Sequence, residues 1–264
     1  MIESLQELIL YENDDFIVIN KPQGVVVNKS LTSADKTISE LTKDYLNLVK
    51  PKNFLNSSLN DQEFYDRNGV VHRLDKETNG VLLIAKNPAS YTELKNQFLK
   101  RKIKKEYHAV CFNDISNFFN GKQTLLINLP LIRDPKNRHQ FAVSKMGRDA
   151  VSKVTLLLDY NNKSVKNGVG YVDGQYYSFV KVLPKTGRTH QIRVHLKALN
   201  SEIVGDDVYN GRGQKKINEK YNLRLCLIAK KLDFKVFDKE YSFEVPYNEN
   251  FDRAVRELLL STKT

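Results

Sequence analysis

The chain has 264 residues, of which 41% are hydrophobic, and this is enough to fill the core of an ordinary globular protein. It carries 42 Lys and Arg residues against 31 Asp and Glu residues, a formal net charge of +11, and no apolar run approaches the roughly 20 residues that a membrane-spanning helix needs. The positive charge favours a polyanionic partner, nucleic acid first, although a Lys-rich surface that is simply solvated is a competing explanation.

The N-terminal segment and the two cysteines bear on the compartment. Residues 1–8, MIESLQEL, are acidic and lack the cationic start and apolar centre of a signal peptide. Cys111 and Cys226 each lie inside an apolar stretch, so both are interpreted as small buried hydrophobic residues rather than as parts of a disulfide framework or a zinc site. We therefore expect a soluble protein of a reducing compartment, the cytoplasm.

Runs of strand length recur along the chain, with few helices between them. The expected strands are 16–20, 24–27, 80–86, 104–112, 124–128, 151–158, 176–183, 225–232 and 241–245. Helical spacing of apolar residues predicts helices at 36–48, 89–99 and 189–199. The polar stretches 53–69, 161–175 and 211–221 are expected to be surface loops.

Many strands with helices inserted singly indicate an α+β fold, built on a large, mainly antiparallel mixed sheet that is flanked by helices and loops. No internal repeat and no Pro/Gly/Ser-rich linker divides the chain. We expect one domain over residues 1–264, with its core at about 15–245, and nothing in the sequence demands more than a monomer.

The first candidate for chemistry is Asp75, in the run VHRLDKETNG at residues 71–80. Asn79-Gly80 is a residue pair that tolerates positive φ and predicts a tight turn. The apolar run 81–85 that follows predicts a buried strand, so Asp75 is expected on a polar loop at the rim of a sheet. Asp is also common before turns for reasons of backbone hydrogen bonding alone, which is the structural alternative.

The second candidate is a basic run that ends in an aromatic residue. Five cations occur within residues 100–105, and Tyr107 follows closely. Such a track can guide a phosphate backbone while the ring stacks on a base. The run can equally be a solvated face, and Tyr107 can be a tyrosine of the core.

The third candidate is the run TGRTHQIRVHL at residues 186–196, which follows a strand and opens a helix. Gly187 permits a turn and Thr189 is a plausible N-cap. The first helical turn then carries His190, Gln191 and Arg193 near its positive end, which suits an anionic ligand. The alternative is a solvated helix end above core positions.

Together these runs resemble the signature motifs of the RluA-type RNA pseudouridine synthases. The motifs are HRLD with Thr78 and Gly80, the KEY element at 105–107, and GRTHQIRVHL at 187–196. Further matches are NKPxG at 20–24, the segment 145–150, and GDxxY at 205–209. The resemblance runs in order from about residue 15 to 245.

This resemblance implies isomerisation of uridine in structured RNA, either rRNA or tRNA, without a metal or an organic cofactor. The HRLD aspartate is the nucleophile of the family, a role that carries over to Asp75. The motif tyrosine, which stacks on the target base, corresponds to Tyr107, and the arginine that pairs with the catalytic aspartate corresponds to Arg193. Arg73 would help to hold the extruded nucleotide.

Physical chemistry agrees with these roles, because a nearby guanidinium favours the ionised form of a carboxylate nucleophile and carries a permanent charge. The residues that we expect to contact RNA are cationic or polar side chains of the same motifs: Lys21, His72, Arg73, Lys104, Lys105, Arg188, His190 and Gln191.

The chain departs from the family pattern at Asn28, Asn79 and Ile228, where the family often has other residues. None of these is a catalytic position. The resemblance begins close to residue 15, so we expect no S4 RNA-binding domain, and the catalytic domain is expected to bind the RNA by itself.

Two other functions stay open from the residues. A metal-dependent nuclease could take ligands from His72, Asp75, Glu77, His190, His195, Asp206 and Asp207. Its weakness is that two of these histidines lie five residues apart on one expected helix, about 140° out of register, whereas ligand pairs on one face use a spacing of three or four. A non-catalytic RNA-binding protein is the other alternative.

Overall fold

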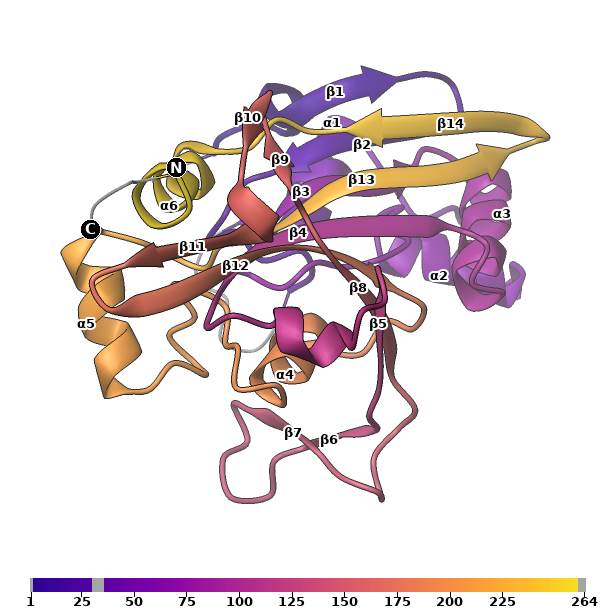
Figure 1. Cartoon of the computed structure of the whole chain (residues 1–264). Coiled ribbons are helices and arrows are strands. Elements are labelled where there is room, and N and C mark those ends of the chain that lie inside the picture. The colour runs from indigo at the N-terminus through magenta and orange to yellow at the C-terminus, as the bar shows by residue number, and fades with distance from the viewer. Residues whose placement is uncertain (1, 30–35, 261–264) are drawn as a thin grey trace. The chain divides into compact units, whose positions relative to one another are not determined.

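The computed structural model describes residues 2–29 and 36–260 (Figure 1). The chain divides into two compact units. Unit 1 contains Met1–Lys105 and Ala229–Val245, and unit 2 contains Glu106–Ile228 and Pro246–Thr264. The single domain expected over residues 1–264 stays a prediction, and residues 1, 30–35 and 261–264 of it lie outside the described residues.

Unit 1 is built on antiparallel strands. These are β1 (Ile9–Glu12), β2 (Phe16–Lys21), β3 (Asn79–Ala85) and β13 (Leu227–Val236) in that order, with β14 (Lys239–Glu244) paired to β13. The register of β2 and β3 places Lys21 opposite Gly80, at the end of β3 where the Asp75 segment enters. The sheet of unit 1 therefore fixes the base of the loop that carries Asp75.

Burial explains why these strands form. Every residue of β3 is buried, and β2 buries Phe16 through Ile19. Each fully buried aliphatic side chain contributes about 1.5–3 kcal/mol. Phe16 also meets Phe234 of β13 and Tyr241 of β14 edge-to-face, with ring centroids 5.1 and 4.8 Å apart. This aromatic cluster joins the first strands of unit 1 to its last hairpin.

The helices of unit 1 are α1 (Ile38–Tyr45), α2 (Leu59–Asp66) and α3 (Pro88–Leu99), with short 3-10 turns at Leu5–Leu8 and Phe54–Asn56. Thr37 and Glu40 form a capping box at the start of α1. Asn87 caps α3, and Pro88 stands at its first position, where proline loses no hydrogen bond. α2 packs on α3 through Phe64 and Tyr91 (Figure 1).

The main strands of unit 2 are β4 (Lys104–Phe112), β12 (Gln175–Pro184), β8 (Val151–Leu156) and β5 (Leu125–Asn128) in that order, and β11 (Val169–Val172) pairs with β12. Two small hairpins are separate: β6 (Leu131–Arg133) with β7 (Phe141–Val143), and β9 (Asp159–Tyr160) with β10 (Lys163–Ser164). The β6–β7 hairpin projects beyond the other strands of unit 2 (Figure 1).

The helices of unit 2 are α4 (Gln191–Lys197), α5 (Arg212–Lys220) and α6 (Glu249–Leu258), with 3-10 turns at Ser116–Phe119 and Lys166–Gly168. The first six residues of α4 are all buried, whereas α6 is amphipathic and buries one face. Phe251 of α6 stacks on Tyr247 at 4.9 Å and lies near Phe179 of β12. These rings form part of the core of unit 2.

The predicted fold class is confirmed: the structure is α+β, with a mainly antiparallel sheet and helices around it. The predicted strand at 24–27 is wrong. The carbonyls of Val26 and Val27 accept the first amides of α1, from Ile38 and Ser39, so this segment caps the N-terminus of that helix instead of pairing with another strand.

The three predicted loops are also wrong in part. Residues 53–69 contain α2, 211–221 contain α5, and 161–175 contain β10 and β11. Polar composition hid these elements because they are short and their apolar residues are few. Among the described residues, no helix has the length and apolar character that crossing a membrane requires.

Candidate active site

Asp75 lies in a loop of unit 1, residues 71–78, which we call the Asp75 loop. Leu74 is 4% exposed and anchors the loop in the core, while Asp75 itself is half-buried. The amide of Thr78 donates to the carbonyl of Asp75 at 3.1 Å and closes a turn directly before β3. The nucleophile candidate therefore sits on a short turn that is fixed at both ends.

The tight turn predicted at Asn79-Gly80 is wrong, because both residues belong to β3. Gly80 is required for a different reason. Its φ is +122°, and a Cβ at this position would lie 2.2 Å from the carbonyl oxygen of Ala229 in β13. The glycine lets β3 and β13 approach closely at the residue where the Asp75 loop leads into β3.

Lys21 holds the Asp75 loop through a hydrogen bond to its backbone. The side chain is 0% exposed, and its ammonium donates to the carbonyls of Pro22 and Val25, both at 2.8 Å, and of Lys76 at 3.1 Å. Burial lowers the pKa of Lys21 from 10.5 to about 7, and the charges of Glu77 and Asp75 partly oppose that shift. Burial and three carbonyl partners favour a supporting role over the direct RNA contact that the sequence suggested.

His72 and Arg73 differ in exposure. The ring of His72 stacks on Phe98 with centroids 4.6 Å apart, and its Nε2 accepts the amide of Leu83 at 3.0 Å. Burial, with a smaller contribution from Lys105, lowers the pKa of His72 to about 3. His72 is thus neutral at pH 7 and holds the loop against β3, whereas Arg73 is exposed and available to a ligand.

The basic run lies where α3 ends and β4 begins. Lys100, Arg101, Lys102 and Lys104 are exposed. Ile103, at 5% exposure, anchors the run in the core. Lys105 is half-buried, and burial together with Arg101 lowers its pKa. Four of the five predicted cations are therefore presented to solvent, and the fifth packs near His72.

Tyr107 lies on β4 in unit 2, half-buried, with Val182 of β12 as its strand partner. The next residue, His108, is buried on the opposite face, where its ring nitrogens meet Glu106 at 2.8 Å and Tyr247 at 2.6 Å. Tyr107 therefore lies in the first, half-buried part of β4, directly before the buried part that begins at His108.

Arg193 lies on α4 and is 5% exposed. Its Nε and Nη2 donate to the two carboxylate oxygens of Asp206, each at 2.7 Å. The Asp206 carboxylate also accepts the amides of Val208 and Tyr209, and the Arg193 guanidinium lies 5.1 Å from the ring centroid of Tyr209. A bidentate pair of this kind fixes the plane as well as the position of the guanidinium.

Gln191, expected to contact RNA, is buried and fully bonded inside unit 2. Its side-chain oxygen accepts from Thr186 Oγ1 at 2.6 Å and from the amide of Arg188 at 3.1 Å. Its nitrogen donates to the carbonyl of Val151 and to Ser152 Oγ. Gln191 therefore fixes the turn that begins at Thr186, while Arg188 reaches the carbonyl of Asp149 at 3.0 Å.

The predicted N-cap at Thr189 is wrong. α4 begins one residue later, and its N-cap is His190, in the left-handed region with φ of 56° and without a side-chain cap bond. The Nδ1 of His190 is 2.9 Å from the hydroxyl of Tyr209. The turn from Thr186 to Gln191 supplies the rigidity that a cap would otherwise give.

His195 is a structural residue. Its Nδ1 lies 2.9 Å from Ser152 Oγ and its Nε2 lies 3.0 Å from the carbonyl of Leu129. Since the Leu129 carbonyl can only accept, Nε2 carries the proton of the neutral ring, and Nδ1 accepts from the Ser152 hydroxyl. Both ring nitrogens are occupied, which argues against the metal-ligand role considered for this histidine.

The candidate residues fall in both units. Unit 1 holds Lys21, His72, Arg73, Asp75, Lys104 and Lys105; unit 2 holds Tyr107, Arg188, His190, Gln191 and Arg193. The pairing of Asp75 with Arg193 stays a prediction.

The β6–β7 hairpin is a basic surface that the sequence motifs did not single out. Its exposed cations are Arg133, Lys136 and Arg138, and the exposed Lys145 and Arg148 follow it in the segment 145–150. Gln140 donates to the carbonyl of Val208 at 2.6 Å, and the amide of Phe141 donates to the Tyr209 hydroxyl at 2.9 Å. The density of cations between 133 and 148 was the available signal.

Comparison with known proteins gives one family. The family described as RNA pseudouridylate synthase matches residues 15–198, which include Asp75, Tyr107 and Arg193. "Ribosomal large subunit pseudouridine synthase D" of Borreliella burgdorferi is 34% identical over 237 residues, covering 88% of this chain and 64% of that protein. An "Uncharacterized RNA pseudouridine synthase" of Aquifex aeolicus is 33% identical over 207 residues, covering 78% of this chain and 57% of that protein.

The chain thus spans between half and two thirds of the length of these curated relatives. Among solved structures, "Human RNA Pseudouridylate Synthase Domain Containing 1" superposes with a TM-score of 0.67 at 22% sequence identity, covering 94% of this chain and 86% of that one. At that identity the likeness supports the fold alone.

Proposed function

This chain belongs to the RNA pseudouridylate synthase family, and we propose that it converts specific uridines of structured RNA to pseudouridine. The observation that carries the proposal is the family match over residues 15–198, because it includes the Asp75 loop, Tyr107 and Arg193 in order. The names of the curated relatives favour large-subunit ribosomal RNA as substrate, with transfer RNA as the other candidate.

In the proposed reaction Asp75 is the nucleophile. The bond between ribose C1′ and uracil N1 breaks, the base turns, and C5 is joined to C1′. C5 loses its proton and N1 gains one, so product and substrate are isomers and no cofactor is consumed. Arg193 pairs with the Asp75 carboxylate and favours its ionised form. Asp206, which accepts from two nitrogens of the guanidinium, would keep Arg193 oriented for this pairing.

The target uridine must leave its stack, which costs a few kcal/mol. Stacking of the extruded base on Tyr107 would recover about 1–3 kcal/mol of this cost. The exposed cations at 100–104 and on the β6–β7 hairpin support binding through phosphates, which gives affinity without sequence information. Arg73, exposed two residues before Asp75, would hold the extruded nucleotide. We further propose that the protein acts in the cytoplasm as a monomer.

The test is tritium release from [5-³H]uridine in transcribed bacterial large-subunit rRNA, with transcribed tRNA as a second substrate. We expect wild-type protein to release tritium, and Asp75→Ala to release none while it binds the same RNA. Asp66→Ala is the matched control, because Asp66 is an exposed carboxylate of unit 1 that forms an ion pair with the surface residue Lys50.

Tritium release by Asp75→Ala at the wild-type rate would reject the nucleophile assignment. An Asp75→Ala variant that restores the cellular function of the protein without forming product would favour the non-catalytic RNA-binding alternative. Retention of activity in EDTA is expected for an aspartate-dependent isomerase, and its loss would favour the metal-dependent nuclease.

A further inference from the structure

Helix α5 is joined to Arg193 by buried amide side chains. From α5, Asn218 reaches Asn210, Asn210 holds the backbone of Asp206, and Asp206 holds the Arg193 guanidinium. We propose that Asn218 and Asn210 are positioning residues, which set the orientation of Arg193 for the reaction. This inference rests on the proposed function, since it assumes that Arg193 serves the chemistry.

We call the chain of contacts from Asn218 through Asn210 and Asp206 to Arg193 the relay, and both of its amide side chains bond through their oxygen and their nitrogen. Asn218 Oδ1 accepts the amide of Gly205 at 3.0 Å, and its Nδ2 donates to Asn210 Oδ1 at 2.7 Å. The same Asn210 oxygen accepts the amide of Asp206 at 3.1 Å, and Asn210 Nδ2 donates to the carbonyl of Ile203 at 3.0 Å. A backbone N–H at one end and a backbone C=O at the other fix the orientation of both amides.

Burial makes the relay sensitive to substitution. Asn218 is 5% exposed, Asn210 is 7% exposed and Asp206 is 1% exposed. Each of these side chains finds its hydrogen-bond partners within the protein, and a buried polar group that loses its partner is costly. Removal of either amide would therefore shift the backbone at Asp206 rather than leave it in place.

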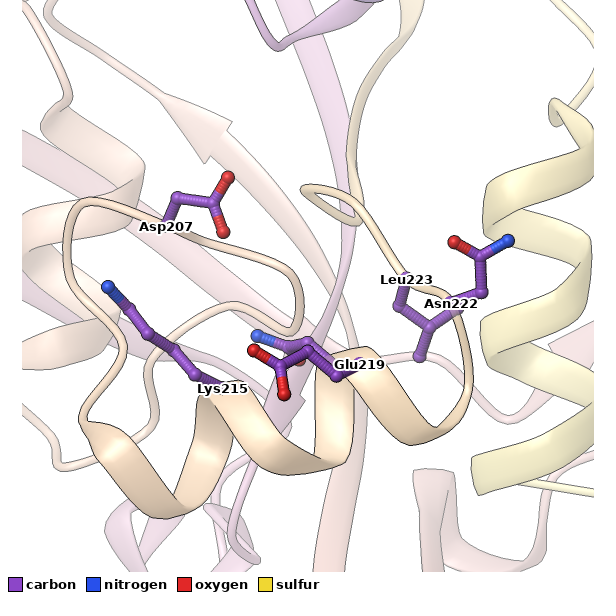
Figure 2. Close-up of a pocket in the computed structure, with 6 residues that line it drawn as sticks. Asp207, Lys215, Glu219, Asn222 and Leu223 are labelled. Atoms are coloured by element: carbon purple, nitrogen blue, oxygen red, sulfur yellow. The ribbon is translucent and has the colours of Figure 1, made fainter.

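Apolar packing contributes little to holding α5. Ile217 is the only apolar side chain on this helix and is half-buried, while its cations face solvent. Figure 2 shows an open, polar pocket beside α5, lined by Asp207 of the loop at residues 204–211 and by Lys215, Asn218 and Glu219 of the helix. Asn218 therefore holds this loop through its hydrogen bonds to Gly205 and Asn210 rather than through apolar packing.

The loop itself is closely fitted on its other side. Gly205 has φ of +76°, and a Cβ there would lie 2.1 Å from the backbone of Arg224. The backbone of the loop is therefore in close contact with the segment at Arg224. A catalytic group misplaced by 1 Å can lose about 100-fold in rate. The pair of Arg193 with Asp206 passes a shift of this loop directly to the guanidinium.

The experiment compares Asn218→Ala and Asn218→Asp with wild type in single turnover on transcribed large-subunit rRNA. We expect Asn218→Ala to lower the turnover rate at least ten-fold while the Kd for RNA stays within two-fold. Asn218→Asp keeps the side-chain volume and the acceptor for Gly205, so it also covers the case in which the alanine variant does not fold. Its carboxyl group can donate to Asn210 only when protonated, so its rate relative to wild type should rise as the pH falls from 8 to 5.5.

Gln214 provides the matched control on the same helix. Its side chain accepts the amide of Gly211 and donates to Glu202, each at 2.9 Å, outside the relay. Gln214→Ala and Gln214→Glu should both react within two-fold of wild type, and the rate of Gln214→Glu relative to wild type should not vary with pH.

Two results would overturn the proposal: a folded Asn218→Ala variant with a wild-type rate, or equally reduced rates in the Asn218 and Gln214 variants, which would indicate general loosening of α5.

If wild-type protein forms no pseudouridine on any RNA tested, the proposed function fails instead. Hydrogen exchange of the Arg193 Nε–H, followed by NMR, then tests the relay alone. Asn218→Ala should accelerate it at least ten-fold and Gln214→Ala should not, and unchanged exchange in Asn218→Ala would reject the relay.

Discussion

The ammonium group of Lys21 donates a hydrogen bond to the carbonyl of Lys76, one residue after Asp75, at a distance of 3.1 Å. The amide of Gly24 donates to the same carbonyl at 2.9 Å. The end of β2 and the turn that follows it are thereby joined to the Asp75 loop. Support for the candidate nucleophile thus comes from a segment 55 residues away in sequence.

Replacing Lys21 with methionine removes the donor for three carbonyls at once. We expect Lys21→Met to lower the free energy of unfolding by about 1–3 kcal/mol, since the carbonyls of Pro22 and Val25 lose the ammonium donor, while that of Lys76 keeps the amide of Gly24. The turnover rate should fall with it, because the Asp75 loop loses a support. Urea unfolding and tritium release measure the two effects, with the exposed Lys43→Met as control. A Lys21→Met protein with wild-type stability and rate contradicts this prediction.

The pKa of Lys21 also predicts a dependence of stability on pH. Burial lowers it from 10.5 to about 7, so between these values the unfolded state holds more protons than the folded state. The free energy of unfolding should therefore rise with pH across this window, by at most about 1.4 kcal/mol per pH unit. The quantity to measure is the difference between wild type and Lys21→Met from pH 7 to 10. A flat difference would show that Lys21 is not held in this environment.

His72 predicts the corresponding behaviour in acid. Its pKa is lowered from 6.5 to about 3, again mainly by burial, so the unfolded state holds more protons between these values. Stability should rise with pH across that window and be lost as the pH falls below about 6.5. In His72→Gln the amide oxygen can still accept from Leu83 but does not titrate, so the decrease in stability should be smaller. Thermal unfolding of both proteins from pH 4 to 7 provides the comparison.

The β6–β7 hairpin should bind RNA through phosphates. We expect Lys136→Gln with Arg138→Gln to weaken binding to all RNA sequences alike and to reduce the slope of log K against log salt by about 0.7–0.9 for each phosphate that is no longer neutralised. The control is Lys163→Gln with Lys166→Gln, which removes two exposed cations elsewhere in unit 2. Filter binding from 50 to 300 mM salt measures both. Equal effects of the two pairs would mean that only net charge matters.

Tyr107 should act through its ring rather than its hydroxyl. Tyr107→Phe keeps the stacking surface, and we expect its rate to stay within a few-fold of wild type. Tyr107→Leu removes an aromatic face worth about 1–3 kcal/mol, and single-turnover rates should fall about 5- to 150-fold. Equally low rates in both variants would assign the role to the hydroxyl group instead.

Sequence alone located the elements whose signal is local. The apolar run after HRLD became β3, the pattern at 104–112 became β4, and the helix around Arg193 was found to within two residues at each end. Apolar residues recur in these segments with a regularity that loops lack, so the pattern predicts a strand or a helix. The short polar helix α5 was not predicted, because side-chain amides rather than a stripe of apolar residues hold it in place.

The partners of polar side chains could not be read from the sequence. Lysine is ordinarily exposed, and nothing near Lys21 signals that three carbonyls converge on its ammonium. Gln191 was expected to contact a ligand because it stands among cations, yet it bonds to Thr186 of its own turn and to Val151 of β8. The hydrogen bonds between Arg193 and Asp206 form because the chain after α4 folds back against this helix. The number of residues between the two side chains does not predict this path.

Tyr209 contacts both the β6–β7 hairpin and Arg193. Its hydroxyl accepts the amide of Phe141 on the basic hairpin, and its ring lies beneath the guanidinium of Arg193. A change of side chain here would alter the seating of the hairpin and the environment of the arginine together. Variants of this protein engineered to bind another RNA should therefore keep Tyr209 and change the residues at the tip of the hairpin instead.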